Sequence, residues 1–363
     1  MDKAFTPQLL PLSFEQLDFT MFFNELIEAN VKLEVYKEKI KDSKLDPDWF
    51  MPTLQHKEAL ASSLLEGTQA TLDGVLINQV APEPKNKNLR EVANYFKATT
   101  LGYRLLNRQD FSNEFFFEIH STLLEGDVRK IPTYKTGEYR TQQNYIGKNE
   151  GHAITYVPPQ PEKIKGLMDN LISYINNPKD DFNELLRVAI IHAQFESIHP
   201  FMDGNGRVGR MLIPMYLYAK KQIDLPCFFI SEALERDKLK YYNLLNNTRK
   251  ENNWNAWIKF FLSTVAKQCD KYIHIMSEIN KLYENHLSLA CEGANSTNMV
   301  KIIDLIYRYP IITSKIVAEE TKIPMSSITR YMNLLVKKNI LDTDNKSRYR
   351  TYICYDLLSI IRP

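Results

Sequence analysis

The stretch from His199 to Arg210, HPFMDGNGRVGR, decides how the centre of this 363-residue chain folds. Apolar residues on most faces of 182–191 predict a buried helix just before it. Pro200 predicts that this helix ends near Ile198, because the residue before a proline is driven out of the α region. A second helix is expected to begin near Arg207. The stretch is therefore a short loop held between two helix ends.

The side chains of this loop suit the binding of a polyphosphate. Gly204 and Gly206 allow positive φ and let backbone N–H groups approach an anion closely. The second helix adds its free N–H groups and its positive dipole end. Arg207 and Arg210 are three residues apart, so both can reach one polyphosphate. Asp203 is a hard oxygen ligand of the kind that Mg²⁺ prefers.

His199, with an ordinary pKa of ~6.5, is the candidate general base. His192, Glu196 and His199 also have the spacing of a metal triad on one helix face. Pro200 and the lack of a further ligand cluster argue against zinc there. An EF-hand loop beginning at Asp203 is excluded, because arginine and valine occupy two of its required positions. The remaining alternative is a glycine-rich turn between helices with solvated arginines.

The stretch resembles the core motif of the Fic (filamentation induced by cAMP) family, H-P-F-x-D/E-G-N-G-R-x-x-R, at every defined position. The resemblance implies a Fic helical bundle and transfer of AMP from ATP to a protein hydroxyl. It implies that His199 deprotonates the hydroxyl, that Asp203 binds Mg²⁺, and that the two arginines hold the phosphates. By the same resemblance, the nucleotide-binding positions of the loop are Gly204, Asn205, Gly206, Arg207, Gly209 and Arg210.

Residues 58–68, EALASSLLEGT, resemble the inhibitory helix of that family, (S/T)-x-x-x-E-(G/N). Its defined positions are Ser62, Glu66 and Gly67. The implied mechanism is a pair between Glu66 and Arg210 that occupies the arginine needed for the γ-phosphate. A buried pair of this kind is directional and leaves a costly unpaired charge when it breaks. The alternative is an ordinary helix that ends at a glycine, with Glu66 in solvent.

Residues 137–147 and 153–159 predict two short strands joined by a polar turn. They resemble the β-hairpin flap that family members carry over the active site, whose edge could pair with a target segment. A plain structural hairpin is the alternative. Tyr241 and Arg249 resemble the family's adenine-site segment, although tyrosines at helical spacing also fit a core. The flap residues expected to bind the nucleotide are Asn144, Tyr145, Ile146 and Gly147.

Residues 297–363 hold 11 Lys and Arg against 6 Asp and Glu, a net charge of +5. Their pattern predicts helices over 298–307, 314–321 and 324–337, followed by a β-hairpin, which is the order of elements in a winged helix-turn-helix domain. DNA contact through the third helix and the wing, and docking or dimerisation, carry equal weight. The candidate DNA contacts are Ser326, Ser327, Arg330, Asn333, Arg348 and Arg350.

Composition is that of an ordinary globular protein, with 44% hydrophobic and 25% charged residues and a net charge of +2. Four scattered cysteines without a CxxC pair favour a cytoplasmic location. Neither a signal pattern nor a bilayer-spanning run is seen, so no membrane association is expected. The expected parts are an N-terminal helical region with the inhibitory helix (1–111), a Fic core (112–265), a connecting helix (266–296) and a winged helix (297–363).

These observations predict a mainly α protein that acts as an autoinhibited protein adenylyltransferase. Its cofactors would be ATP and Mg²⁺, and its target a Tyr, Thr or Ser hydroxyl of another protein or of the chain itself. Two alternatives stay open. In one, the same site removes AMP from modified targets, with Glu66 positioning a water; in the other, the winged helix makes the protein a DNA-binding regulator. A homodimer is left open, since the sequence is silent on oligomeric state.

Overall fold

Helices make up most of the computed structural model, which describes residues 4–83, 85–126, 135–147, 156–292, 297–344 and 350–362. The prediction of a mainly α protein is confirmed. The helices before the motif loop are η1 (Phe14–Gln16), η2 (Phe19–Met21), α1 (Phe23–Lys41), α2 (Pro47–Leu65), α3 (Leu72–Val80), α4 (Lys87–Leu106), α5 (Asn113–Leu123), α6 (Pro161–Asn176) and α7 (Glu184–Ile198). Those after it are α8 (Asn205–Ala219), α9 (Ser231–Arg236), α10 (Lys238–Lys250), α11 (Trp254–Cys291), α12 (Thr297–Arg308), α13 (Ser314–Thr321), α14 (Met325–Lys337) and α15 (Tyr355–Ile361). The strands are β1 (Ile311–Thr313), β2 (Asp342–Thr343) and β3 (Thr351–Ile353).

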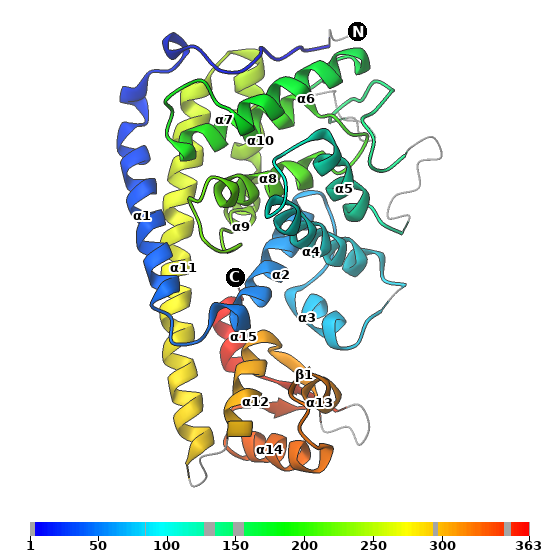
Figure 1. The fold of residues 1–363 in the computed structure, drawn as a ribbon, viewed down its shortest axis with the longest axis vertical. Helices are drawn as coiled ribbons and strands as arrows, with labels where there is room; N and C mark the ends of the chain where they lie inside the picture. The colour runs from blue at the N-terminus through cyan, green and yellow to red at the C-terminus, as the bar shows by residue number, and fades with distance from the viewer. Residues whose placement is uncertain are drawn as a thin grey trace.

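The longest helix, α11, spans most of the height of the molecule and lies beside α1 (Figure 1). It contains 38 residues, which at 1.5 Å per residue makes it about 57 Å long. It contacts α7 and α10 toward its start and α12 and α15 toward its end. The expected boundary between residues 265 and 266 falls within this continuous helix. The core and the expected connecting helix therefore share one element.

Helices α7 and α8 pack against each other and carry the motif loop between them. Every residue of α7 from Leu185 to Ile198 is buried, as the apolar pattern predicted. The helix ends at Ile198, and His199 follows in the left-handed region with φ 50°. Helix α8 begins at Asn205, two residues earlier than predicted, because Gly204 with φ 77° turns the chain directly into the helix.

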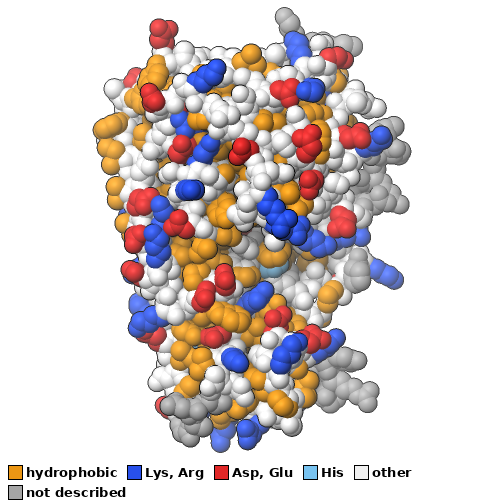
Figure 2. Space-filling view, viewed as in Figure 1, with side chains coloured by type: hydrophobic (Ala, Val, Ile, Leu, Met, Phe, Trp, Pro, Cys, Tyr) orange, Lys and Arg blue, Asp and Glu red, His pale blue; other side chains and the backbone are white. Residues whose placement is uncertain are grey.

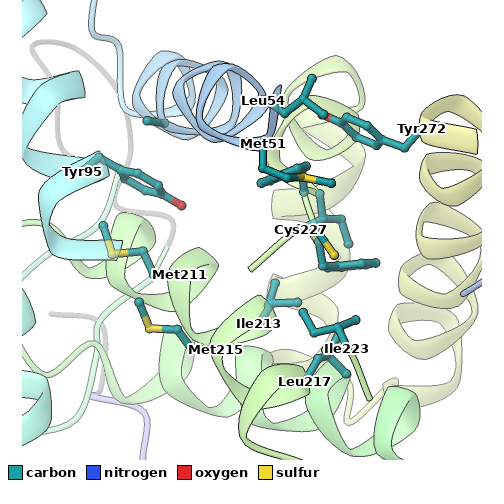
Figure 3. Close-up of a cluster of buried hydrophobic side chains, with 14 of the residues drawn as sticks. Met51, Leu54, Tyr95, Met211, Ile213, Met215, Leu217, Ile223, Cys227 and Tyr272 are labelled. Carbon is teal, nitrogen blue, oxygen red and sulfur yellow. The ribbon is translucent and has the colours of Figure 1, made fainter. Parts of the chain in front are cut away.

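Helix α2, which carries the predicted inhibitory sequence, is packed from several sides. Figure 3 shows Met51 and Leu54 of α2 in one buried cluster with Ile213 of α8 and Tyr272 of α11. On another side, Thr53 Oγ1 lies 3.1 Å from the carbonyl oxygen of Arg308, at the end of α12. Helix α2 is thus held between the central bundle and the C-terminal elements.

Among the described residues of the predicted β-hairpin flap, one antiparallel bridge joins the two limbs, between Ile146 and Tyr156. Residues 137–145 form no strand, and residues 148–155 lie outside the described part of the chain. The Arg140 guanidinium also joins the two limbs. It donates to the carbonyls of Gln142 (3.0 Å) and Pro159 (2.5 Å).

The C-terminal residues form α12, β1, α13, α14, β2, β3 and α15, with the strands in the antiparallel order β1-β3-β2. Helix α13 has the predicted bounds, and α12 and α14 differ from prediction by about one residue. Strand β1 and helix α15 were not predicted. Of the predicted DNA contacts, Arg330 and Asn333 are exposed on α14, whereas Arg348 lies outside the described residues. A winged helix remains our interpretation of this region.

Figure 2 shows basic and acidic side chains interspersed over the visible face, without a large area of one sign. Within the described part of the chain, the structure contains no helix that is both long and apolar enough to cross a membrane.

Candidate active site

The backbone of the motif loop is held at each successive carbonyl. Arg140 donates from Nε to the carbonyl of His199 (3.0 Å) and from its backbone N–H to the carbonyl of Pro200 (2.9 Å). Asn205 folds back over the loop: its Nδ2 donates to the carbonyl of Phe201 (2.7 Å), and its Oδ1 accepts the N–H of the same residue (2.8 Å). The predicted nucleotide ligand Asn205 therefore shapes the loop through its side chain.

The last two carbonyls of the loop are held from the flap segment and from α5. Asn144 Nδ2 donates to the carbonyl of Met202 (3.2 Å), and His120 Nε2 lies 3.1 Å from the carbonyl oxygen of Asp203. Asn144 was predicted to bind nucleotide, but its amide is engaged with the loop. His120 was not predicted at all, because a single histidine in an apolar helix belongs to no motif.

His199 is half-buried at the point where α7 ends. Burial lowers the pKa of its imidazole to about 3, and the nearby guanidinium groups of Arg249 and Arg140 act in the same direction. The imidazole is neutral at neutral pH, which is the form that accepts a proton, although its basicity is reduced.

The two motif arginines lie on the first turns of α8, and both are fully buried. Arg210 donates from Nε to Ser62 Oγ (2.8 Å) and from Nη2 to the carbonyl of Ser62 (2.9 Å). Arg207 differs: within the described residues its three guanidinium nitrogens have no hydrogen-bond partner, and Asp203 Oδ1 lies 3.5 Å from its Nη2. Burying a cation without hydrogen bonds is unfavourable, so this arginine is suited to an anionic ligand.

The predicted contact between Glu66 and Arg210 is present, with Glu66 Oε1 2.7 Å from Arg210 Nη2. Glu66 follows the last residue of α2, and Gly67 follows with φ 89°. Burial raises the pKa of Glu66. The Arg210 guanidinium, together with Arg207 and His199, outweighs this effect, so the pKa of Glu66 lies below its ordinary value. A Cβ at Gly206 would clash with Glu66 Oε1. Glycine at this position lets the carboxylate reach the motif helix.

Two more buried carboxylates lie close to Arg210. Burial raises the pKa of Glu196 to about 7, and one of its oxygens, Oε1, has no hydrogen-bond partner among the described residues. Burial also raises the pKa of Glu58 to about 7, despite the N–H of Ser231, which donates to it at 3.0 Å. Glu58 had no predicted role, and Glu196 was considered only as a member of the metal triad that Pro200 argues against. Both shifts arise from burial, which is consistent with little solvent around Arg210.

The predicted adenine-site residues Tyr241 and Arg249 both lie on α10. Tyr241 is fully buried, and its hydroxyl is 2.9 Å from His192 Nε2, while His192 Nδ1 lies 2.9 Å from the carbonyl of Gly209. This supports a core role for His192. Arg249 lies over the ring of Tyr156 at 4.1 Å. No group of three or more His, Cys, Asp or Glu able to hold a metal occurs in the described part of the chain.

The remaining flap residues lie at different depths. Tyr145 is half-exposed, with a relative exposure of 48%, and its N–H donates to the side chain of Asn144 (2.9 Å). Ile146 makes the bridge to Tyr156, and Gly147 has φ 87°. Arg140 and Asn144 of the flap segment both contact the motif loop through hydrogen bonds of their side chains.

Comparison with known proteins agrees with this site. Residues 110–217 match the Fic/DOC family, and residues 23–104 match the Fic/DOC family N-terminal region. The two matches together cover just over half of the chain, and the motif loop lies within the first. The chain belongs to the Fic/DOC family.

Particular relatives carry the name protein adenylyltransferase Fic. The one from Aedes aegypti is 30% identical over 224 residues, which is 61% of this chain and 40% of that protein. The one from Culex quinquefasciatus is 28% identical over 224 residues, or 61% of this chain and 39% of that protein. The chain thus matches less than half the length of these relatives.

Solved structures show the same fold. A Fic family protein from Desulfovibrio desulfuricans G20 superimposes with a TM-score of 0.60 at 18% identity, covering 96% of this chain and 98% of that one. Fic-1 from C. elegans (residues 134–508) superimposes with a TM-score of 0.53 at 17% identity, covering 70% and 72% of the two chains. The predicted Fic helical bundle is confirmed.

Proposed function

We propose that this protein is an adenylyltransferase that moves AMP from ATP to a Tyr, Thr or Ser hydroxyl of a protein, itself included. The observation that carries the proposal is the state of Arg207, a fully buried cation without a hydrogen bond among the described residues. It lies on the first turn of α8, whose free N–H groups attract anions. A polyphosphate supplies the missing acceptors. The names of the relatives support the same activity.

In the proposed reaction, the target hydroxyl oxygen attacks the α-phosphorus of ATP and neutral His199 accepts its proton. The bond from that phosphorus to the bridging oxygen breaks, so AMP stays on the target and pyrophosphate leaves. Arg207 and the N–H groups at the start of α8 stabilise the charge on the phosphates. Phosphoryl-type transfer depends mainly on such positioning and charge stabilisation.

Asp203 is the residue that would hold Mg²⁺. Its carboxylate is 12% exposed and its Oδ1 accepts the N–H of Gly204 (2.6 Å). One protein carboxylate together with substrate phosphates is a donor set that fits Mg²⁺, which keeps several waters and seldom needs a full protein cage. When bound, the ion would neutralise charge on the phosphates.

We further propose that the arrangement described is autoinhibited. Ser62 and Glu66 accept hydrogen bonds from Nε and Nη2 of Arg210, the arginine proposed to hold the γ-phosphate. While these contacts persist, the terminal phosphate lacks its partner and the α-phosphorus is not aligned for attack. Loss of the Glu66 carboxylate removes the charged partner of Arg210 and leaves the contacts with Ser62.

The test is label transfer from α-³²P ATP with Mg²⁺, comparing the unmodified chain, Glu66→Gly and Glu66→Gly/His199→Ala. Glu125→Gln is the matched control, since Glu125 lies on the surface 3.5 Å from Lys97. We expect protein-bound label with Glu66→Gly alone. No label in any variant contradicts AMP transfer. Loss of AMP release from a modified target in Glu66→Gly supports the removal reaction instead, and a DNA footprint that survives His199→Ala but not Arg330→Ala supports the regulator alternative.

A further inference from the structure

His120 lies on α5 between the root of the flap and the motif loop, and it is fully buried. Its ring stacks on Phe201, with centroids 3.8 Å apart and planes within 6°. Its Nδ1 accepts the N–H of Gly137 (2.9 Å), and its Nε2 lies 3.1 Å from the carbonyl oxygen of Asp203. One side chain therefore contacts the flap root and both a ring and a carbonyl of the motif loop.

The hydrogen bonds fix which nitrogen of His120 carries the proton. The backbone N–H of Gly137 can only donate, so Nδ1 must be the acceptor. The proton of the neutral ring is then on Nε2, where it is donated to the carbonyl of Asp203. The imidazole thus accepts a hydrogen bond from the flap through Nδ1 and donates one to the motif loop through Nε2.

Of the two residues that His120 joins, Gly137 is itself a glycine in left-handed backbone and Asp203 directly precedes one. Gly137 has φ 77°, and a Cβ there would lie 3.2 Å from the carbonyl oxygen of Phe117. Asp203 precedes Gly204, which also has φ 77°. A Cβ at Gly204 would lie 3.7 Å from Cδ2 of the His120 ring. Glycine adopts this backbone without strain but can adopt many others, so surrounding contacts select the conformation. His120 supplies a contact to each.

We propose that His120 is a positioning residue, which sets the Asp203 peptide and the start of α8 relative to the flap. This inference rests on the proposed AMP transfer and extends it to a residue outside every motif. The direction of the Asp203 carboxylate and of the N–H groups after Gly204 follows from the peptide that His120 holds. The flap root is held by the same ring, so target binding and phosphate binding share this support.

Buried histidines elsewhere in the chain provide a contrast. His286 of α11 is also buried, but its Nδ1 faces the hydroxyl of Tyr307 at 3.2 Å, among the C-terminal elements. Replacing it removes a buried imidazole without touching the loop or the flap. His286→Phe is therefore the matched control for loss of stability alone.

Three substitutions separate the two hydrogen bonds, each made in the Glu66→Gly background. His120→Phe keeps the stacking and loses both bonds. His120→Gln offers an amide donor at the position of Nε2 toward Asp203, and His120→Asn offers an acceptor at the position of Nδ1 toward Gly137. Each is compared by melting temperature, by kcat and KM for AMP transfer, by ATP binding and by amide hydrogen exchange.

We expect His120→Phe to lower kcat about 100-fold, the effect of an error near 1 Å in the reacting groups. His120→Phe should also raise KM for the protein target, because the bond to the flap root is lost. His120→Gln should recover about tenfold in kcat, and His120→Asn should restore KM for the protein target but not kcat. Amide exchange should rise after Asp203 in the Phe and Asn variants, and near Gly137 in the Phe and Gln variants. His286→Phe should lower the melting temperature and leave kcat unchanged.

The inference is overturned if His120→Phe transfers AMP as fast as its parent, or if all three variants differ in melting temperature alone. If the Glu66→Gly parent transfers no AMP, the proposed function fails by itself. Amide exchange then still decides the inference, because unchanged exchange after Asp203 in His120→Phe refutes it without any catalytic readout.

Discussion

Glu66→Gln isolates the charge of the proposed inhibitory contact with Arg210, because it keeps the size and shape of the side chain. The change leaves Arg210 buried beside a neutral group. Breaking a buried ion pair from one side costs about 3–5 kcal/mol. The lower value, about 3 kcal/mol, applies since the Glu66 side chain is 25% exposed and Ser62 still accepts from Nε and Nη2 of Arg210.

This loss converts to a measurable melting temperature. An unfolding entropy of ~2.1 cal/mol/K per residue gives about 0.8 kcal/mol/K for the 363 residues. The midpoint should therefore fall by about 4 °C in the absence of nucleotide. ATP with Mg²⁺ at about 100 times its Kd adds about 2.7 kcal/mol, so the variant should regain most of the loss.

The assay is thermal unfolding with and without ATP and Mg²⁺, for the unmodified chain, Glu66→Gln and the surface control Glu125→Gln. The unmodified chain should gain less from ATP than Glu66→Gln, since Arg210 is already engaged. Equal ATP shifts for the two chains, together with an unchanged midpoint in Glu66→Gln, would refute the view that this carboxylate occupies Arg210.

Other predictions concern titration and stability. The pKa of Glu196 is raised to about 7 by burial, so the folded state binds its proton more tightly than the unfolded state and stability falls as pH rises from about 4.5 through 7. Glu196→Gln should therefore stabilise the protein at pH 8 by up to about 3 kcal/mol and have no such effect at pH 4; an equal gain at both pH values in thermal unfolding contradicts this. Because the pKa of His199 is lowered to about 3, AMP transfer by Glu66→Gly should show no fall with a midpoint near 6.5 as pH decreases from neutral. A midpoint there in a pH–rate profile would show that this imidazole gains its proton in the working enzyme.

The local parts of the site could be predicted from the sequence. Pro200 sets the end of α7 through a steric rule that acts on one neighbour, and Gly204 sets the turn that follows. The contact of Glu66 with Arg210 spans 144 residues, so no local rule could give it. It was predicted only because two sequence motifs resembled those of one family.

The supports of the site could not be predicted in this way. His120 bonds to residues 17 and 83 positions away, and neither bond leaves a pattern in the surrounding sequence. Strand β1 has three residues and depends on pairing with β3, from Ile311 opposite Ile353 onward. The continuity of α11 could have been predicted, because residues 254–291 contain neither proline nor glycine to end a helix.

The length of α11 has a consequence for any attempt to divide the protein. Residues near its start pack in the Fic core, and Ile279, Tyr283 and Ala290 near its end are buried where α12 and α15 cover it. A chain cut after residue 292 would expose the apolar face at the end of α11 to solvent. It would also remove the contact between α2 and the carbonyl of Arg308. The Fic core and the C-terminal elements therefore share one continuous helix, α11. Either region expressed alone should aggregate and should not fold as an isolated module.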